Sequence, residues 1–372
     1  MSEYQYYEFQ AIDRPLARGE QEMLRSISSR GRITATSFSN HYEWGDFKGD
    51  PRRLMESCFD LHLYFANWGT RRLMIRVPER LVDRGGLADF LNEVDWVKTW
   101  ISAPHLIIDI CRDEVEPDDD QWDDGAGWLA ALAPLRGDLL SGDLRLFYLL
   151  WLSALEDGFL RDETPEPLPG IGPMTGALDA AAEFFDIDPD LVQAAAAVSP
   201  DDGELSPEAM RDFLATLSEQ EKTDLLARLM EGDAHVGSEL RRRARERSGR
   251  PGGARRTVGE LREMAREIRM ARDRLEAERR EAEVRRQAEE AEKARRARLD
   301  ALKRRGSSIW QDIEAEIGRR NASGYDRAVT LLADLKAIAS EQGAMADFSN
   351  RLRTIRERHA RKGQFITRLQ GL

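Results

Sequence analysis

The chain has 372 residues, of which 33% are charged and 41% hydrophobic, and its formal net charge is −12 at pH 7. This length predicts two or three domains, and the acidic balance argues against a general nucleic-acid-binding protein. The first residues lack the basic and apolar segments of a secretory signal, and the longest apolar run, Leu144 to Leu155, is too short to cross a bilayer. The two cysteines, Cys58 and Cys111, fit a reducing compartment, so we expect a cytoplasmic protein with no membrane contact.

Residues 1–163 are expected to form an α+β domain in which helices cover a sheet. Alternating apolar side chains predict strands over residues 4–12 and 32–38, with a short helix between them. Asp50 followed by Pro51 is typical of a helix start, because the aspartate can cap the helix and proline fits its first position.

A β-hairpin is the clearest local pattern of this domain. Residues 59–66 and 72–77 both alternate apolar and polar side chains, and the turn-forming segment Asn67-Trp68-Gly69-Thr70 joins them. His62 falls on the polar side of the hairpin, so we interpret it as a solvent-facing histidine. Two more strands are expected, over residues 97–102 and 105–111.

Beyond these strands the chain becomes helical. An acidic segment, residues 114–124, is expected to lie at the surface, and helices are predicted over residues 127–135 and 143–157. A proline-rich break at residues 164–173 then marks a boundary.

The next region, residues 174–248, is predicted to hold short helices. Ser218 and Glu221 have the spacing of a capping box, in which each residue's side chain bonds the other's backbone N–H. A glycine-rich segment, residues 249–253, is interpreted as a joint before the next element.

Residues 256–305 are predicted to form one long charged helix. This segment is rich in Arg, Glu, Ala and Leu, and its acids and bases recur at i,i+3 and i,i+4 spacing. We expect a packed first half, a solvated middle and an end that packs again. The first half has an apolar 3-4 spacing that predicts coiled-coil packing through Leu261, Met264, Ile268, Ala271 and Leu275. A salt-bridged helix in water, a helix paired with a partner or a second copy, and a nucleic-acid contact all stay open.

Residues 306–372 are expected to form a C-terminal helical bundle or cap. Three apolar stripes at helical spacing predict three helices, and Ser308 with Gln311 resembles a capping box at the start of the first. The fold class predicted for the whole chain is therefore α+β followed by mainly α, with the long helix and the bundle at the end.

No motif for a cofactor or a catalytic centre stands out. The chain has no phosphate-binding glycine loop, no CxxC pair and no HExxH, so we predict neither a cofactor nor a metal site. Asp109, followed by Asp113 and Glu114, is the one carboxylate group that a metal-dependent hydrolase could use. An enzyme is the less favoured interpretation.

Aromatic residues gather in the first hundred positions, and Arg71 and Arg72 lie close to Trp68 in sequence. Such a group is typical of an exposed protein-interaction surface, where Trp and Arg are enriched. The alternative, which we favour, is that the aromatic side chains fill the core of the α+β domain.

Two segments resemble known proteins. The opening YQYYEFQAIDRPL, with TSFSNHYEWGDFKGDP and LYFANWGTRRLMIRVP, resembles a family of uncharacterised bacterial proteins, which implies no particular activity. The C-terminal segment YDRAVTLLADLKAIASEQGAMADFSNRLRTIRERHARKGQFITRLQGL is similar to the helical tail of many bacterial SWIM zinc finger proteins. The CxC and CxH of the SWIM motif are absent here, so the resemblance implies a helical docking module without zinc.

Three functions follow from these patterns, in order of preference. The first is an interaction or scaffold subunit whose long helix and C-terminal helices dock a protein partner or a second copy. The second is a nucleic-acid-associated protein that uses the Arg-rich region from Arg241, Arg242 and Arg243 onward. The third is a metal-dependent hydrolase around Asp109.

Overall fold

The computed structural model describes residues 3–113, 115, 123–198, 206–248 and 254–372. Most of the predicted acidic segment, 114–124, and the whole of the predicted joint, 249–253, lie outside the described residues. The chain divides into two compact units, residues 1–272 and 273–372, and each is taken by itself below. Among the helices that the structure describes, none combines the length and apolar character that crossing a bilayer would require.

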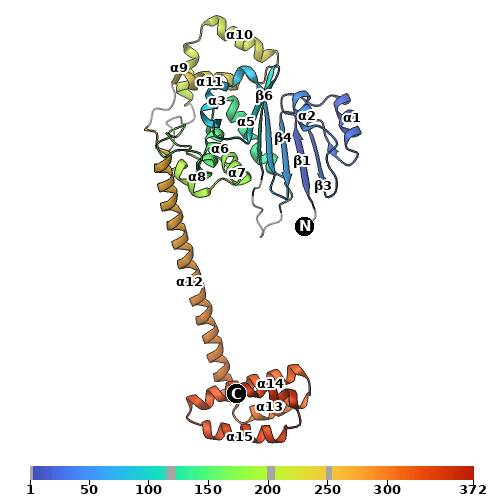
Figure 1. The fold of residues 1–372 in the computed structure, drawn as a ribbon, viewed down its shortest axis with the longest axis vertical. Coiled ribbons are helices and arrows are strands. Elements are labelled where there is room, and N and C mark those ends of the chain that lie inside the picture. Colours follow the sequence, from blue (N-terminus) through green and yellow to red (C-terminus); the bar gives the residue numbers. More distant parts are fainter. Residues whose placement is uncertain (1–2, 114, 116–122, 199–205, 249–253) are drawn as a thin grey trace. The chain divides into compact units, whose positions relative to one another are not determined.

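A seven-stranded antiparallel sheet is the framework of the first unit (Figure 1). Its strands, in spatial order, are β2 (Arg32–Ile33), β3 (Ser37–Tyr42), β1 (Gln5–Gln10), β4 (Leu61–Ala66), β5 (Arg71–Pro78), β7 (His105–Arg112) and β6 (Val97–Ser102). The predicted hairpin is confirmed, because β4 and β5 pair directly with Leu63 opposite Leu73. The α+β prediction for this part of the chain is confirmed with it.

The single strand predicted over residues 32–38 is wrong, because two strands and a tight turn occupy this segment. The Thr34 hydroxyl lies 2.7 Å from the Ser37 hydroxyl and accepts a hydrogen bond from the backbone N–H of Thr36 at 3.1 Å. A threonine that bonds its own backbone two residues on favours a turn over a strand.

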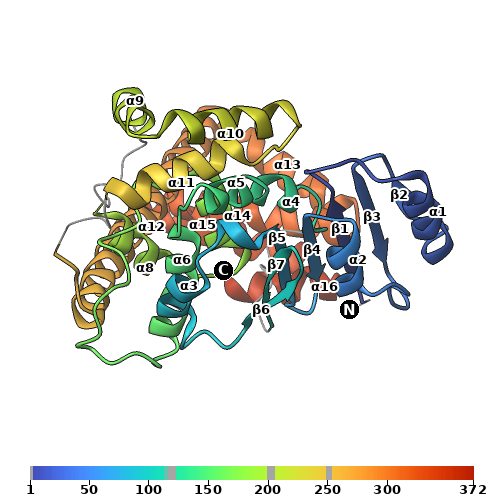
Figure 2. The ribbon, with the colours of Figure 1, turned by 90° about the horizontal axis from the view of Figure 1, so that it is seen from above.

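One face of the sheet is covered by helices that share a single apolar core with it. The inward residues of β4 and β5 are fully or almost fully buried, and they are Leu61, Leu63, Phe65, Leu73, Ile75 and Val77. The covering helices are α3 (Arg84–Leu91), α4 (Trp128–Leu132), α5 (Pro134–Leu140), α6 (Arg145–Glu156), α7 (Gly176–Phe184) and α8 (Pro189–Ala196). Figure 2 shows α4 and α5 on this side of the strands and α2 on the other.

The helix predicted over residues 127–135 is broken in two at Ala133, so that α4 and α5 follow each other. Pro134 explains the break, because proline has no N–H to continue the helix and fits the first position of a new one. Helix α6 is buried along ten consecutive residues, Leu146 to Leu155, as expected of a core helix.

The opposite face of the sheet is covered at one end by α1 (Arg18–Ile27) and α2 (Pro51–Ser57). The predicted cap of α2 is confirmed, because the Asp50 carboxylate accepts a hydrogen bond from the backbone N–H of Arg52 at 2.9 Å. Phe9, Phe38 and Phe59 fill the space beneath these helices and are fully buried. Both faces of the sheet therefore carry apolar cores.

The prediction of a solvent-facing His62 is wrong, since this side chain is 0% exposed in the second core. Its ring stacks on Phe9 with ring centroids 4.0 Å apart, and Nδ1 lies 3.0 Å from the backbone oxygen of Glu8. Burial lowers the pKa of His62 to about 3, because the charged imidazolium cannot be hydrated there.

His62 should make the protein sensitive to mild acid. The unfolded chain takes up a proton at His62 near pH 6.5, whereas the folded chain stays neutral until about pH 3, so stability falls as the pH drops through this window. The slope from this residue is at most about 1.4 kcal/mol per pH unit. Urea unfolding at several pH values between 7 and 5 should give a smaller pH slope for His62→Gln than for the parent protein. The exposed His41→Gln serves as the control, and equal slopes for all three proteins would contradict the assignment.

A buried ionic network ties the ends of three strands together. Asp60, which is 1% exposed, accepts hydrogen bonds from the backbone N–H groups of Ile12 and Asp13 through one carboxylate oxygen. Its other oxygen accepts two bonds from the Arg76 guanidinium, at 3.1 and 2.8 Å. Arg136, 3% exposed, lies 3.6 Å from Asp60 and pairs with Asp13 at 2.7 Å, so the network holds two carboxylates and two guanidinium groups.

A further helical layer of the first unit has a small core of its own. It consists of α9 (Pro207–Ala215), α10 (Glu219–Met230) and α11 (Val236–Ser248). The predicted capping box is confirmed: the Ser218 hydroxyl accepts from the Glu221 N–H at 3.2 Å, and the Glu221 carboxylate accepts from the Ser218 N–H at 3.0 Å.

The predicted long helix is α12 (Val258–Arg305), which begins in the first unit and ends in the second. Its start is held by Glu166, which is 0% exposed and receives the Arg256 guanidinium at 2.8 Å and the Arg256 backbone N–H at 2.8 Å. The hydroxyl of Tyr148 donates to the same carboxylate. Arg256 also donates to the backbone oxygen of Ala194 at 2.6 Å, near the end of α8.

The predicted packing of the first half of this helix is found only as far as Ile268, because Ala271 and Leu275 are exposed. Val258 and Leu261 are 0% exposed and Ala265 is 4% exposed, and all three belong to the core of the first unit. Arg269 and Arg272 add ion pairs to Asp190, at 3.0 and 2.7 Å. Residues 271–298 are exposed apart from half-buried Glu283, which confirms the solvated middle.

The second unit is a helical bundle with a separate core. Besides the end of α12 it contains α13 (Ser308–Gly318), α14 (Ala322–Glu341), α15 (Met345–Arg358) and α16 (Gly363–Arg368). Leu299 and Leu302 of α12 are each 6% exposed in this core, so the predicted repacking of the helix end is confirmed. The short helix α16, which places Phe365 in the core, was not among the predicted elements.

The capping box predicted at Ser308 and Gln311 is wrong, because Ser308 is already the first residue of α13. Its hydroxyl donates instead to the backbone oxygen of Arg305 at 2.9 Å. Helix α12 is followed by Gly306, whose positive φ of 58° turns the chain sharply into α13. Ser307, at the N-cap position, has helical and not extended backbone angles, so it does not cap the helix.

Candidate functional site

The residues predicted to form a coiled-coil seam are largely occupied within the first unit. Leu261 is fully buried, and Met264 and Ile268 are half-buried against the same core. Ala271 and Leu275 are exposed, Leu275 by 48%. A second helix would therefore find two of the five residues of the predicted seam available to it.

Two of the three arginines predicted to contact nucleic acid are held by carboxylates on the surface of the first unit. Arg242 pairs with Glu246 at 2.7 Å and Arg243 pairs with Glu221 at 3.0 Å. Arg241 is exposed. The cluster therefore presents less free positive charge than its sequence indicates.

The predicted aromatic-arginine surface is divided between two faces of the sheet. Arg71 is 8% exposed and lies over the Phe65 ring, with its guanidinium carbon 3.8 Å from the ring centroid. Arg72, the next residue along β5, points to the opposite face and pairs with Asp109. Trp68, in the turn, is 48% exposed.

Asp109 is not arranged as a metal ligand. Both of its carboxylate oxygens accept hydrogen bonds from Arg72, at 2.7 Å each, so the guanidinium occupies the positions that a cation would need. Among the described residues no group of three or more His, Cys, Asp or Glu side chains could hold a metal ion. Asp109 therefore acts as the ion-pair partner of Arg72 within the sheet.

The second unit contains a groove that is open to solvent. It lies between α13 and α15 and has a volume of about 430 Å³, within the roughly 300–1,000 Å³ of binding pockets. Its lining residues are Trp310, Gln311, Glu314, Arg351, Thr354, Ile355 and Arg358.

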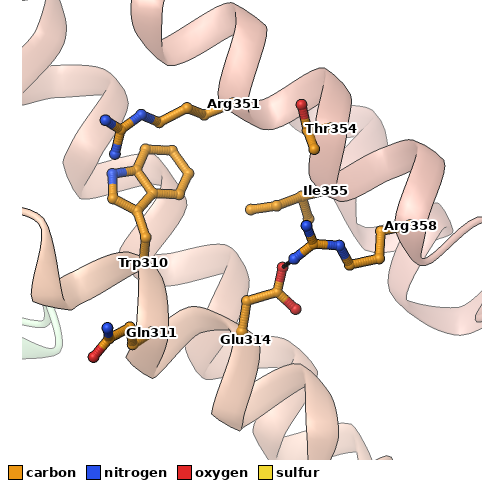
Figure 3. Close-up of a pocket in the computed structure, with 7 residues that line it drawn as sticks. All are labelled: Trp310, Gln311, Glu314, Arg351, Thr354, Ile355 and Arg358. Carbon is orange, nitrogen blue, oxygen red and sulfur yellow. Dashed lines mark hydrogen bonds and ion pairs between the residues drawn. The ribbon is translucent and has the colours of Figure 1, made fainter.

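Helical spacing explains why these side chains face each other. Trp310 and Glu314 are four residues apart and share one stripe of α13, while Arg351, Ile355 and Arg358 follow at i, i+4 and i+7 on α15. Figure 3 shows the two stripes across an open space, with Trp310 on one side and Ile355 and Arg358 on the other. Ile355 is 5% exposed and forms the floor, because it also belongs to the core of the bundle.

The charges at the two ends of the groove differ. At one end Arg358 donates to Glu314 at 2.8 Å, and the same carboxylate lies 2.7 Å from Nε2 of His359. At the other end Arg351 lies over the Trp310 ring, 5.4 Å from the centroid (Figure 3). Within the described residues Arg351 has no ion pair with an Asp or Glu side chain. At one end the arginine is thus paired with a carboxylate, whereas at the other the arginine has no such partner among the described residues.

None of the interaction residues predicted from the sequence lines this groove, and Gln311, which does line it, was predicted only as part of a helix cap. A signal was present: Trp310 follows Ile309, the first residue of the buried stripe Ile309, Ile313 and Ile317, and therefore lies at the edge of the core. A large aromatic residue in this position with arginines on the facing helix has the composition of an interaction site. The site could not be predicted from this composition alone, because the sequence does not show that α13 packs beside α15.

The indole, the apolar floor and the arginine of the groove are suited to binding. Glu314 is already engaged by Arg358 and His359, so it is not a free base, and the groove contains no thiol.

A comparison with known proteins finds no match: no family model fits the chain, and no curated protein or solved structure resembles it closely enough to be matched.

Proposed function

We propose that this protein is an interaction adaptor, in which the α+β unit holds the start of α12 and the C-terminal helical unit docks a partner protein. The observation that carries the proposal is the groove of Trp310, Ile355 and Arg351, which joins a partly exposed indole, an apolar floor and an unpaired cation. Trp and Arg are the residues most enriched at the energetic centres of protein interfaces. The proposal includes a cytoplasmic location, supported by the two free thiols of Cys58 and Cys111.

The structure of α12 is consistent with such a role. Its exposed middle is neutralised by pairs within the helix itself, among them Arg274 with Glu278 at 3.1 Å and Arg286 with Glu283 at 2.7 Å. Such pairs support an isolated helix surface without a partner. The exposed part of α12 thus serves as a link, and docking falls to the groove.

A nucleic-acid-associated function is the second candidate, and the charge distribution favours it. Residues 241–372 hold 35 Lys and Arg against 21 Asp and Glu, a net charge of +14, whereas residues 1–240 hold 21 against 47, a net charge of −26. The pairing of Arg242, Arg243 and the α12 side chains weakens it, because charges that are already neutralised release few counterions from a phosphate backbone.

Substitutions in the groove should remove partner binding and leave the fold intact. Trp310→Ala and Arg351→Glu are expected to abolish capture of one specific protein from the native host, because they remove the aromatic contact and reverse the free charge. The measurement is affinity capture with the full-length protein, quantified by mass spectrometry. Arg327→Glu, an equal charge reversal at an exposed position of α14, is the matched control.

The adaptor proposal fails if the captured proteins are the same for the groove variants and for the Arg327 control. It also fails if the material carries nucleic acid in place of a protein partner. Circular dichroism melting should show that Arg351→Glu is folded and as stable as the parent protein, because the Arg351 side chain lies outside the core.

A further inference from the structure

We propose that the groove between α13 and α15 takes an acidic amphipathic segment of another protein, with one bulky apolar side chain seated between Trp310 and Ile355 and carboxylates facing Arg351. This inference rests on the proposed adaptor function and specifies the chemistry of its partner. It follows from the shape of the floor, from the charge around it and from the orientation of the tryptophan.

The floor of the groove selects an apolar side chain. Ile355 is almost completely buried, and the half-buried Trp310 stands beside it against Phe348, with ring centroids 6.1 Å apart. Thr354 and the aliphatic parts of Arg351 and Arg358 complete the walls. A concave apolar surface between two helices fits an anchoring side chain of an amphipathic helix or extended peptide.

The charge around the groove selects carboxylates. Residues 345–372 hold seven Lys and Arg against two Asp and Glu. Arg351 is exposed and unpaired with any described carboxylate, while the groove's own Glu314 is engaged by Arg358 and His359. A basic patch beside an apolar floor is complementary to a segment that alternates acidic and bulky apolar residues. Guanidinium groups bind carboxylates with two parallel hydrogen bonds, which adds direction to the contact.

The same residues are poorly arranged for a nucleic-acid strand. Arg351 lies over the Trp310 ring, so a base that stacked there would have to displace this guanidinium, whereas an apolar side chain between Trp310 and Ile355 would not. The Glu314 carboxylate within the lining would repel a phosphate at the other end. A single-stranded nucleic acid is therefore an outcome of the test and not the proposal.

The test is selection from a displayed library of random sixteen-residue peptides on the full-length protein, with counter-selection on Trp310→Ala. The enriched peptides should carry a net negative charge and at least one Trp, Phe, Leu or Met. Fluorescence anisotropy should then show about tenfold weaker binding of the leading peptide to Arg351→Glu and an unchanged affinity for Arg327→Glu. A single-stranded oligonucleotide serves as the competing probe.

Each result decides the inference. Enrichment of acidic, apolar peptides that lose affinity with Arg351→Glu supports it. Enrichment of neutral or basic peptides, no enrichment that depends on Trp310, or tighter binding of the oligonucleotide than of any peptide overturns it. If host capture depends on Trp310 while selection yields no acidic peptides, the adaptor function stands and the inference about its partner is wrong; if capture ignores Trp310, the adaptor function itself is wrong.

Discussion

Glu166→Gln is expected to lower the free energy of unfolding of the first unit by about 3–5 kcal/mol, the usual effect of breaking a buried ion pair. The carboxylate is fully buried and holds both the guanidinium and the backbone N–H of Arg256. Removing its charge leaves the Arg256 guanidinium partly buried without its counter-ion. Burial and the adjacent Glu166 carboxylate also raise the pKa of Tyr148, so this hydroxyl stays protonated and remains a donor to the site.

The effect of Glu166→Gln should be local as well as global. Amide hydrogen exchange is expected to accelerate in the first turns of α12, around Val258 and Leu261, more than elsewhere in that helix. The reason is that Glu166 binds Arg256, which lies just before the helix starts. Urea unfolding and hydrogen exchange measure the two effects. Glu260→Gln is the matched control: Glu260 caps the same helix start at Thr257, is itself not buried, and glutamine can replace it in a capping box. Equal stability losses for the two variants would contradict the assigned role of Glu166.

Asp60→Asn is expected to cost a similar amount, about 3–5 kcal/mol, for a related reason. The carboxylate accepts two bonds from Arg76, lies 3.6 Å from Arg136 and also holds the backbone N–H groups of Ile12 and Asp13. Asparagine has one acceptor oxygen in place of two and no charge, so either the backbone pair or Arg76 loses its partner. Thermal and urea unfolding of the full-length protein measure the loss.

Asp50→Asn provides the control for Asp60→Asn, because it makes the same chemical change at a helix cap. Asparagine caps helices about as well as aspartate, so less than about 0.5 kcal/mol should be lost. A loss at Asp60 no greater than at Asp50 would mean that Asp13 alone satisfies the buried arginines.

Local patterns of the sequence predict the elements of this fold well. The hairpin of β4 and β5, the cap at Asp50 and the capping box at Ser218 are interactions between residues close in sequence, and each is found as expected. The errors arise where a distant segment decides. His62 alternates with apolar neighbours as a solvent-facing residue would. The helix start at Asp50 predicts α2, but the sequence does not state that α1 and α2 pack over the second face of the sheet, where His62 lies.

The candidate site shows the same limit more sharply. The apolar spacing from Leu261 onward predicts packing correctly but does not name the partner surface, which is the core of the first unit. Trp310 and Arg351 lie 41 positions apart, and each is unremarkable within its own helix. Only the packing of α13 beside α15 brings them to one groove, so the site belongs to the tertiary structure.

Helix α12 begins in one apolar core and ends in another. Packing at its two ends therefore stabilises the helical conformation of its exposed middle. Nucleating the first turn of a free helix is the costly step, with a nucleation parameter of roughly 10⁻³, whereas extending an existing helix costs little. Tertiary packing supplies a nucleus at Val258 and Leu261 and a second at Leu299 and Leu302. Residues 271–298 only have to propagate from either end, so their helicity should survive the melting of one core and disappear when both have melted.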